Sequence, residues 1–323
     1  MKIKINKKEF DIHNNEILED LVKKHFKEKN IVAAKVNNSL CDLSETIEEN
    51  SDIELISTND KDGLEVMRHT CAHVFGHAIK QLYPDVQMVI GPVIENGFYY
   101  DILSNISISE KELNLIENRM RKLIKKNYII VREVVSKDKA ISIFEARNEP
   151  YKIELLKEIP KNDVIAIYHH EEYIDMCRGP HLTNTRHIKA FKLMKTSGSY
   201  WKGNSENQPL TRIYGTAWPS VEDQESYIKS LAEAEKRDHR VLGKKLDLFH
   251  FQEESPGMVF WHNKGWTIFN IIKDFITDYL MKNSYEIINT PQILDKSLWK
   301  KSGHLDKFGD LIFDVGSEKK EFA

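Results

Sequence analysis

The sequence predicts an α+β protein built from several domains. Its 323 residues are more than one compact core normally holds. Hydrophobic residues make up 41% and charged residues 30%, which is the composition of a folded globular protein. Short alternating segments near the start, a polar stretch after them and later segments with helical spacing predict units that differ in their mixture of strand and helix.

Residues 1–61 predict a small β-grasp-like module. KIKI and EFDI alternate like strands around a turn at Asn6, Lys7 and Lys8, and ILEDLVKKHF has helical periodicity. IVAAKV and DIELIS then predict further extended segments. The polar stretch from Ser57 to Gly63 is typical of a linker, so we expect a second domain to begin there.

Residues 62–219 predict a second domain that mixes helices and strands. Apolar residues at helical spacing from Glu65 to Tyr83 predict a helix that stops at Pro84. The extended run MVIGPVIENGFYYDI follows, and SEKELNLIENRMRKLIKKN predicts an amphipathic helix capped by Ser109 with Glu112 three residues on. DVIAIYHHEEYIDM is rich in residues that favour strands.

Residues 220–243 predict a polar helix that connects domains, and residues 244–323 predict an incomplete third unit. This unit contains a Pro-Gly turn, a strongly apolar helix and YEIINTPQIL, which predicts a strand interrupted by Pro291. The last stretch, DVGSEKKEFA, is polar and gives no sign of a finished core.

Two short motifs carry the chemistry that is easiest to interpret: HVFGH with His73 and His77, and CRGPH with Cys177 and His181. Histidines at i and i+4 share one face of a helix, whereas Gly179-Pro180 predicts a rigid loop. We expect this helix and loop to converge on a small substrate or an ion.

Two other interpretations of these motifs stay open. Three histidines and a cysteine suit tetrahedral zinc, although HVFGH lacks the glutamate that an HExxH protease uses as its base. A thiolate at Cys177 beside histidines would also permit covalent catalysis. Hydrolysis of an activated ester by water needs neither a metal nor a covalent intermediate.

Composition and charge exclude several classes of protein. The cysteines Cys41, Cys71 and Cys177 are few and widely spaced, which favours a reducing compartment, and we expect the cytoplasm. No apolar run predicts a membrane span or an export signal. A net charge of −3 makes indiscriminate coating of nucleic acid improbable, so any RNA contact must be local. The basic candidates for it are Arg119, Arg121, Lys122, Lys125, Lys126, Lys236, Arg237, Arg240, Lys244 and Lys245, although such charge runs are usually solvated helix faces.

Several long motifs resemble bacterial threonyl-tRNA synthetases. RHTCAHVFGHAIKQLYPDVQMVIGPVIENGFYYDI, YIDMCRGPHL and RIYGTAW resemble the editing domain of that family, and residues 1–61 are similar to its N-terminal TGS module. RDHRVLGKKLDLFHFQEESPGMVFWHNKGWTIFN resembles the linker helix and the opening of the class II catalytic domain, an antiparallel-sheet domain. YEIINTPQILDKSLWKKSGHLDKF resembles motif 1, which would place Pro291 at a homodimer interface.

The resemblance also implies what this chain should lack. The family binds ATP with magnesium through motifs 2 and 3 and binds a catalytic zinc, and these segments have no counterpart before Ala323. We therefore expect no cofactor in this chain and no charging of tRNA by it alone, as for a truncated synthetase. The partners that the resemblance implies are tRNA(Thr), the seryl or threonyl ester of that tRNA, and no membrane.

Roles for the site residues follow from the resemblance. His73 is expected to orient or activate water, and Lys152 to place positive charge near the carbonyl or the leaving oxygen. Asp175 would hold the amino group of serine. Cys177, His181 and His77 would shape the pocket, and Tyr99 and Tyr100 would line its wall or stack near the terminal adenosine.

Editing is needed because serine lacks only one methyl of threonine, a difference worth about 1–3 kcal/mol in a binding pocket. The predicted activity is therefore hydrolysis of mischarged Ser-tRNA(Thr). The alternatives are a noncatalytic module for tRNA binding and dimerisation, and a metal-dependent hydrolase.

Overall fold

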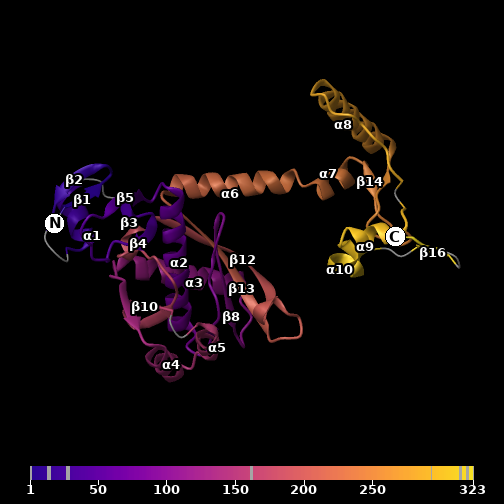
Figure 1. Ribbon diagram of the computed structural model, residues 1–323. Coiled ribbons are helices and arrows are strands. Elements are labelled where there is room, and N and C mark those ends of the chain that lie inside the picture. The colour runs from indigo at the N-terminus through magenta and orange to yellow at the C-terminus, as the bar shows by residue number, and fades with distance from the viewer. Residues whose placement is uncertain are drawn as a thin grey trace. The chain divides into compact units, whose positions relative to one another are not determined.

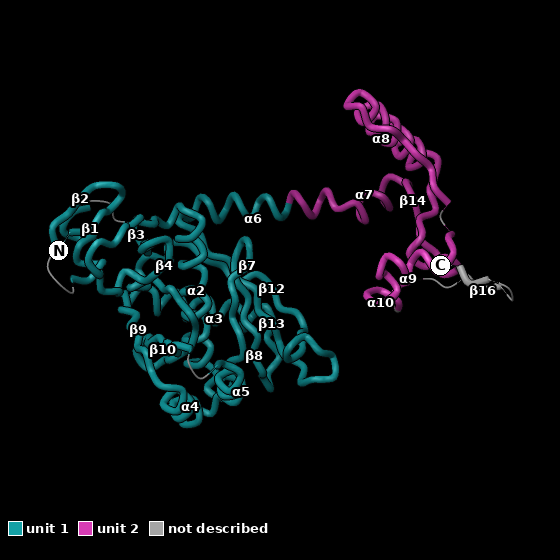
Figure 2. Tube along the Cα trace, viewed as in Figure 1, with its two compact units in different colours: residues 1–232 teal, residues 233–323 magenta. Residues whose placement is uncertain are grey.

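The computed structural model describes residues 2–12, 16–26, 30–160, 163–291, 293–312, 315–317 and 320–322. The chain forms two compact units, residues 1–232 and residues 233–323 (Figure 2). Both units combine helices with strands, which confirms the mixed α+β prediction. None of the helices in the described ranges is long and apolar enough to cross a membrane.

The first unit opens with a five-stranded sheet in the order β2-β1-β5-β3-β4 (Figure 1). Its elements are β1 (Lys2–Ile5), β2 (Lys8–Asp11), α1 (Leu18–His25), β3 (Ile31–Val36), β4 (Ser39–Asp42) and β5 (Asp52–Ser57). The pair β1–β5 is parallel and the other pairs are antiparallel. Asn6 and Lys7 have positive φ, as a tight hairpin turn requires, so the predicted turn is confirmed.

Helix α1 covers this sheet with its apolar side. Leu18 and Leu21 are fully buried and pack with Ile3, Ile5 and Ile53 from the sheet. These residues alternate along β1 and recur at helical spacing along α1, so the sequence pattern alone brings the two apolar faces together.

The rest of the first unit is organised around α2 (Lys61–Leu82). This helix packs against α3 and against a sheet in the order β12-β13-β8-β6, with β7 paired to β8 (Figure 1). The elements are β6 (Gln87–Met88), β7 (Val93–Ile94), β8 (Gly97–Leu103), α3 (Glu110–Lys125), β12 (Ala190–Tyr200) and β13 (Pro209–Trp218). The Ser109 cap forms with Glu112 as predicted, in a capping box at the start of α3.

A second, three-stranded antiparallel sheet lies in the same unit, in the order β11-β10-β9. Its strands are β9 (Val131–Val135), β10 (Ile165–His170) and β11 (Tyr173–Met176). Helices α4 (Lys137–Ala146) and α5 (Pro150–Glu158) lie between β9 and β10 in the sequence, and the short helix η1 (Thr185–His187) follows β11. Helices α4 and α5 bury Phe144 and Leu156 against Ile167 of β10. A further short helix, η2 (Trp201–Gly203), connects β12 to β13.

The connecting segment is not the single helix predicted over 220–243. It consists of α6 (Val221–Lys236) and α7 (His239–Lys245). Asp238 interrupts the helix because its side chain accepts a hydrogen bond from the backbone N–H of Arg240 and so caps α7. The boundary between the two compact units falls within α6, after Ala232.

The second unit contains two small two-stranded sheets and several helices. Its elements are β14 (Phe249–His250), β15 (Phe260–Trp261), α8 (Asn263–Lys282), α9 (Lys296–Lys301), α10 (His304–Phe308), η3 (Gly309–Leu311), β16 (Val315–Ser317) and β17 (Lys320–Phe322). The Pro-Gly turn is present, with positive φ at Gly257. Helix α8 forms as expected, but its apolar side chains Ile271 and Phe275 are exposed.

The predicted strand over YEIINTPQIL is wrong for the described residues. Residues 285–291 and 293–294 form no named strand, and Ile288 is 80% exposed. A strand needs a neighbour for its backbone N–H and C=O groups, and no described segment pairs with this one. Gln292 and most of the terminal DVGSEKKEFA segment lie outside the described residues.

Candidate functional site

Helix α2 presents histidines on one face at intervals of one turn. His69, His73 and His77 are four residues apart, and the last two are buried at 3% and 1% exposure. Gly76 allows this part of α2 to approach β11 closely, since a Cβ atom there would lie 2.2 Å from the hydroxyl of Tyr173. The close packing of helix on strand therefore buries the histidine face in the interior of the first unit.

The loop after β11 brings the second motif to this face. Gly179 has a φ of +71°, in the left-handed region, and the Gly179–Pro180 peptide bond is cis. Cys177 Sγ lies 2.9 Å from His181 Nε2, so the two ends of CRGPH are in contact. The loop prediction and the convergence of loop and helix agree with this geometry.

His181 is held from two sides. Its Nδ1 lies 3.1 Å from the hydroxyl of Thr70, and this hydroxyl also accepts a hydrogen bond from the backbone N–H of Leu182 at 3.0 Å. The backbone N–H of His181 donates to the carboxylate of Asp42, on β4 of the N-terminal sheet. Tyr168 donates a second hydrogen bond to Asp42 at 2.8 Å. The N-terminal sheet therefore helps to fix the orientation of this loop.

The group that the structure assembles contains His69 in place of His77. Ligand atoms of His69, His73, Cys177 and His181 all lie within 4.8 Å of one another. We call these residues the histidine–cysteine cluster. The ring centroids of His69 and His73 lie 4.3 Å and 4.2 Å from that of His181. The sequence contains two overlapping pairs at i and i+4, and our prediction selected the pair one turn too late on the helix.

His77 belongs to a separate polar network. Its Nε2 lies 2.8 Å from a carboxylate oxygen of Glu172 and 3.0 Å from the amide nitrogen of Gln81. Its ring stacks on Tyr173 at 5.7 Å. The zinc-site alternative built from His73, His77, Cys177 and His181 is therefore corrected, because His77 points toward Glu172 at the surface and His69 occupies its place.

An ion pair lies beside the histidine–cysteine cluster. Lys152 Nζ is 2.5 Å from Asp175 Oδ1, and both side chains are almost fully buried. Asp175 also accepts hydrogen bonds from the hydroxyls of Tyr100 at 2.5 Å and Tyr173 at 3.0 Å. Lys152 in turn donates to the Tyr100 hydroxyl at 3.0 Å. The carboxylate of Asp175 thus has a full set of partners within the protein.

The two tyrosines of β8 do not share a wall. Tyr100 is buried and faces Asp175, whereas Tyr99 lies under the guanidinium of Arg212, whose carbon is 3.8 Å from the ring centroid. Neighbouring residues of a strand point to opposite faces. Tyr100 therefore belongs to the site, and the structure places Tyr99 on the other face of the sheet.

Burial sets the protonation of the cluster. It lowers the pKa of His69 to about 4 and the pKa values of His73 and His181 well below the usual range of histidine. Burial likewise raises the pKa of the Cys177 thiol far above its ordinary value. At neutral pH the cluster therefore holds neutral imidazoles and a neutral thiol, which does not favour attack by a thiolate.

The carboxylate of Asp175 behaves differently. Burial alone would raise its pKa, but the charge of Lys152, with the hydrogen bonds from Lys152 and Tyr100, lowers the pKa below its usual range. Asp175 is therefore ionised at neutral pH. His73 Nε2 lies 3.9 Å from Asp175 Oδ2, which is longer than a hydrogen bond.

Several buried ring nitrogens have no hydrogen-bond partner among the described residues. They are Nδ1 of His73, Nδ1 of His77 and both ring nitrogens of His170. Buried polar atoms are normally satisfied, and exceptions concentrate at sites that handle water, ions or substrate. His73 thus has a ring nitrogen that can accept a proton from water, while burial lowers the pKa of its imidazole and so makes it a weaker base than an exposed histidine.

The cluster also has the donor types that bind zinc. Neutral imidazole nitrogens and a cysteine sulfur are common zinc ligands, and four such residues complete a tetrahedral set. The thiol of Cys177 would have to lose its proton to bind zinc, because the ligand is the thiolate. The donor set fits zinc by type.

Comparison with known proteins gives two findings. Residues 165–214 match the family described as "Threonyl and Alanyl tRNA synthetase second additional domain". This segment runs from β10 into β13 and contains Asp175, Cys177 and His181.

Relatives extend the similarity along most of the chain. The chain is 54% identical to the threonine–tRNA ligase of Prochlorococcus marinus (strain MIT 9211) over 292 residues. The aligned segment covers 90% of this chain and 46% of the relative. The chain is 53% identical over 295 residues to the threonine–tRNA ligase of Prochlorococcus marinus subsp. pastoris (strain CCMP1986 / NIES-2087 / MED4), covering 91% of this chain and 46% of the relative. The chain thus spans about half the length of the curated relatives it matches.

Proposed function

The chain is homologous to the N-terminal part of threonine–tRNA ligases over 90% of its length, and from that premise we propose that its histidine–cysteine cluster hydrolyses mischarged Ser-tRNA(Thr). One observation carries the proposal. Helix α2 and the loop after β11 place neutral histidines and a thiol within 4.8 Å of one another, beside the buried Lys152–Asp175 pair. Without the loop, the histidines of α2 would lack the thiol of Cys177 and the imidazole of His181. The site therefore depends on the contact between helix and loop.

Domain assignments form part of the proposal. Residues 1–61 would be a TGS module, and the single helix and the sheet order β2-β1-β5-β3-β4 support its β-grasp character. Residues 62–219 would be the editing domain, residues 220–243 the linker and residues 244–323 the opening of a class II catalytic domain. Support for the second of these assignments comes from the family match over 165–214.

The reaction needs a base for water. A neutral His73 takes a proton from the attacking water as its oxygen forms a bond to the ester carbonyl carbon. When the tetrahedral intermediate collapses, the bond from that carbon to the ribose oxygen breaks, and the ribose oxygen takes the proton. The products are free tRNA and serine, whose carboxyl group ionises and releases one proton to solvent.

Positive charge and hydrogen bonding complete the site. Lys152 places its ammonium where it can stabilise negative charge on the carbonyl or the ribose oxygen. Asp175 holds Lys152 and Tyr100 in place by direct contacts at 2.5 Å. The amino group of serine would have to replace one of these contacts in order to bind Asp175. Selection for a small amino acid would then depend on close packing around its side chain.

Deacylation assays test the proposal. The purified chain should hydrolyse Ser-tRNA(Thr) and leave Thr-tRNA(Thr) intact, and His73→Ala should reduce the rate about 10²–10⁴-fold, the usual contribution of a general base. Equal hydrolysis of both esters, or turnover that His73→Ala leaves unchanged, would remove the basis for the proposal.

A zinc-dependent hydrolase is the second candidate, because the donor atoms of the cluster lie within 4.8 Å of one another. A zinc ion bound there would activate water and polarise the ester carbonyl. Metal analysis separates the two candidates. Stoichiometric zinc that disappears in Cys177→Ala, together with loss of activity in chelator, would favour the metal; full activity in chelator would exclude it.

A further inference from the structure

Two histidines of the second unit face each other where β14 ends and α8 begins. His250 Nδ1 lies 2.7 Å from His262 Nε2. The pairing of β14 with β15 sets His250 opposite Phe260, and the backbone N–H of His262 donates to the carbonyl of Leu248 at 2.9 Å. A Cβ atom at Gly265 would lie 2.0 Å from the same carbonyl, so glycine lets α8 begin close to this segment. The backbone therefore fixes the spacing of the two rings.

The far nitrogen of each ring meets a hydrogen-bond acceptor. His262 Nδ1 lies 2.8 Å from Asp247 Oδ1, and His250 Nε2 lies 3.3 Å from Gln252 Oε1. An ionised carboxylate and an amide oxygen only accept hydrogen bonds, so both far nitrogens carry the hydrogen. A neutral imidazole has a single N–H. The two facing nitrogens therefore both present lone pairs.

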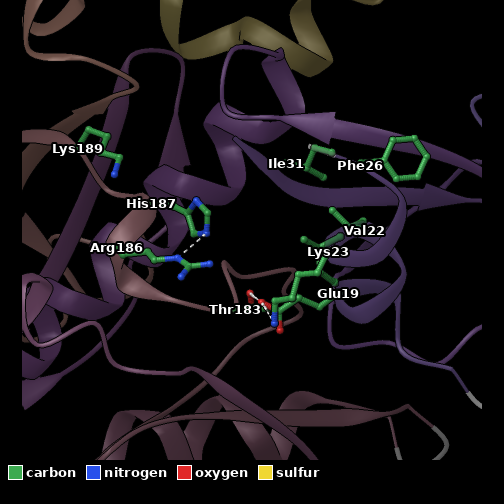
Figure 3. Close-up of a pocket in the computed structure, with 10 residues that line it drawn as sticks. Glu19, Val22, Lys23, Phe26, Ile31, Thr183, Arg186, His187 and Lys189 are labelled. Atoms are coloured by element: carbon green, nitrogen blue, oxygen red, sulfur yellow. Dashed lines mark hydrogen bonds and ion pairs between the residues drawn. The ribbon is translucent and has the colours of Figure 1, made fainter. Parts of the chain in front are cut away.

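Two lone pairs at this distance repel each other unless a cation lies between them. The ordinary arrangement occurs in the groove of the first unit drawn in Figure 3, where the Nε–H of Arg186 donates to Nε2 of His187 at 3.4 Å. In the second unit, a neutral pair gains a donor only if His250 moves its hydrogen to Nδ1, which turns a lone pair toward the oxygen of Gln252. A shared proton or a metal ion satisfies every contact.

We propose that His250 and His262 bind a divalent transition-metal ion through these facing nitrogens, with copper(II) or nickel(II) fitting best. Two nitrogens at about 2.0–2.1 Å from a metal lie about 2.9 Å apart at a right angle and about 3.3 Å apart in a tetrahedron. The observed 2.7 Å is closer to the right angle. Square-planar nitrogen and oxygen sites are typical of these two ions, and imidazole suits both.

The surroundings of the pair support a bound cation. A metal-bound histidine usually donates its other N–H to a carboxylate, and His262 has this arrangement with Asp247. The same carboxylate offsets the positive end of α8, which alone would disfavour a cation. The ring of His250 stacks on that of Phe260, with centroids 5.1 Å apart. Because His250 is exposed and His262 is half-buried, an ion reaches both nitrogens from solvent, and water supplies the remaining ligands.

Isothermal titration calorimetry of the untagged full chain with nickel(II) chloride tests the site. Nickel is the probe because copper(II) oxidises free thiols, and this chain has three free cysteines. His250→Ala and His262→Ala should each weaken one equivalent of nickel by more than about tenfold, because each removes a ligand. The control His239→Ala removes an exposed histidine of the same unit and should change the affinity less than about twofold.

Two further variants separate the site from other effects. Asp247→Asn leaves both ligand atoms in place, and it should weaken nickel by about tenfold through the outer partner while thermal unfolding stays that of the wild type. Cys177→Ala removes a donor of the histidine–cysteine cluster and should leave this equivalent of nickel intact. Nickel binding is measured directly, so the result does not depend on the proposed hydrolysis.

Three results would overturn the proposal. The first is the absence of a nickel equivalent that both His250→Ala and His262→Ala weaken, which would leave a shared proton between the rings. The second is an equal loss of affinity in His239→Ala. The third is an unchanged nickel affinity in a folded Asp247→Asn variant.

Discussion

Removal of the charge of Asp175 gives the sharpest test of how the site is built. Asp175→Asn keeps the size of the side chain but leaves the ammonium of Lys152 buried at 4% exposure without its counter-ion, which now lies 2.5 Å away. Breaking a buried ion pair on one side costs about 3–5 kcal/mol, because the remaining charge is uncompensated. We expect the free energy of opening of the first unit to fall by this amount at pH 7.

Hydrogen–deuterium exchange of peptides from β10 and β11 measures this opening free energy in the intact chain. The control is Lys152→Met combined with Asp175→Asn, which removes both charges while the asparagine oxygen still accepts from Tyr100 and Tyr173. This double variant should recover at least half of the loss.

The difference in opening free energy between the wild type and Asp175→Asn should depend on pH, and the direction of this dependence can be derived. Because the folded-state pKa of Asp175 is lowered, its stabilisation is present above the unfolded pKa of about 3.9 and is lost as the pH falls through the folded value. The wild type and Asp175→Asn should therefore converge only in strong acid. A loss below about 1 kcal/mol, or a double variant no more stable than the single one, would refute the claim that this pair fixes the site.

Three further predictions concern neighbouring residues. Cys177→Ser should keep Ser-tRNA(Thr) hydrolysis within about tenfold in a single-turnover assay, because the neutral thiol does not act as a nucleophile; trapping of a seryl thioester at Cys177 would contradict this. The buried His170 has a pKa lowered to about 3, so the unfolded state binds more protons below pH 6.5 and stability should fall there by up to about 1.4 kcal/mol per pH unit. His170→Phe should flatten the fall of the thermal midpoint between pH 6.5 and 4, and an unchanged slope would argue against a buried neutral imidazole. Glu172→Gln should alter hydrolysis only a few-fold, since Glu172 contacts His77 outside the cluster; a loss as large as that of His73→Ala would put Glu172 in the reaction.

Local rules predicted much of the fold because local interactions decide it. The turn at Asn6 and Lys7, the cap at Ser109 and the helix through His73 depend on residues within a few positions of one another. The break at Asp238 also has a local cause, an aspartate that caps the next helix, and the sequence contains that signal.

The composition of the site could be predicted only in part. HVFGH and CRGPH indicated that a helix and a loop meet, but His69 and His77 lie on the same face of α2 as His73. Which of the two joins the cluster depends on where β11 crosses the helix, a tertiary contact that no helical period encodes. Asp42 could not be found for the same reason, since it lies 139 residues from His181, on β4 of the N-terminal sheet.

Strand pairing limited the prediction for the second unit. YEIINTPQIL has strand-forming residues, yet a strand exists only when a partner accepts its backbone hydrogen bonds, and no described segment does so. The apolar pattern of α8, by contrast, needs no partner to make a helix, because the backbone hydrogen bonds are internal.

Single-turnover deacylation of Ser-tRNA(Thr) by His69→Ala and His77→Ala tests most directly which residues form the site. If the histidine–cysteine cluster handles the water, His69→Ala should slow hydrolysis by about 10²-fold or more, while His77→Ala stays within tenfold of the wild type. The reverse order, with His77→Ala inactive and His69→Ala unimpaired, would contradict the assignment of the cluster.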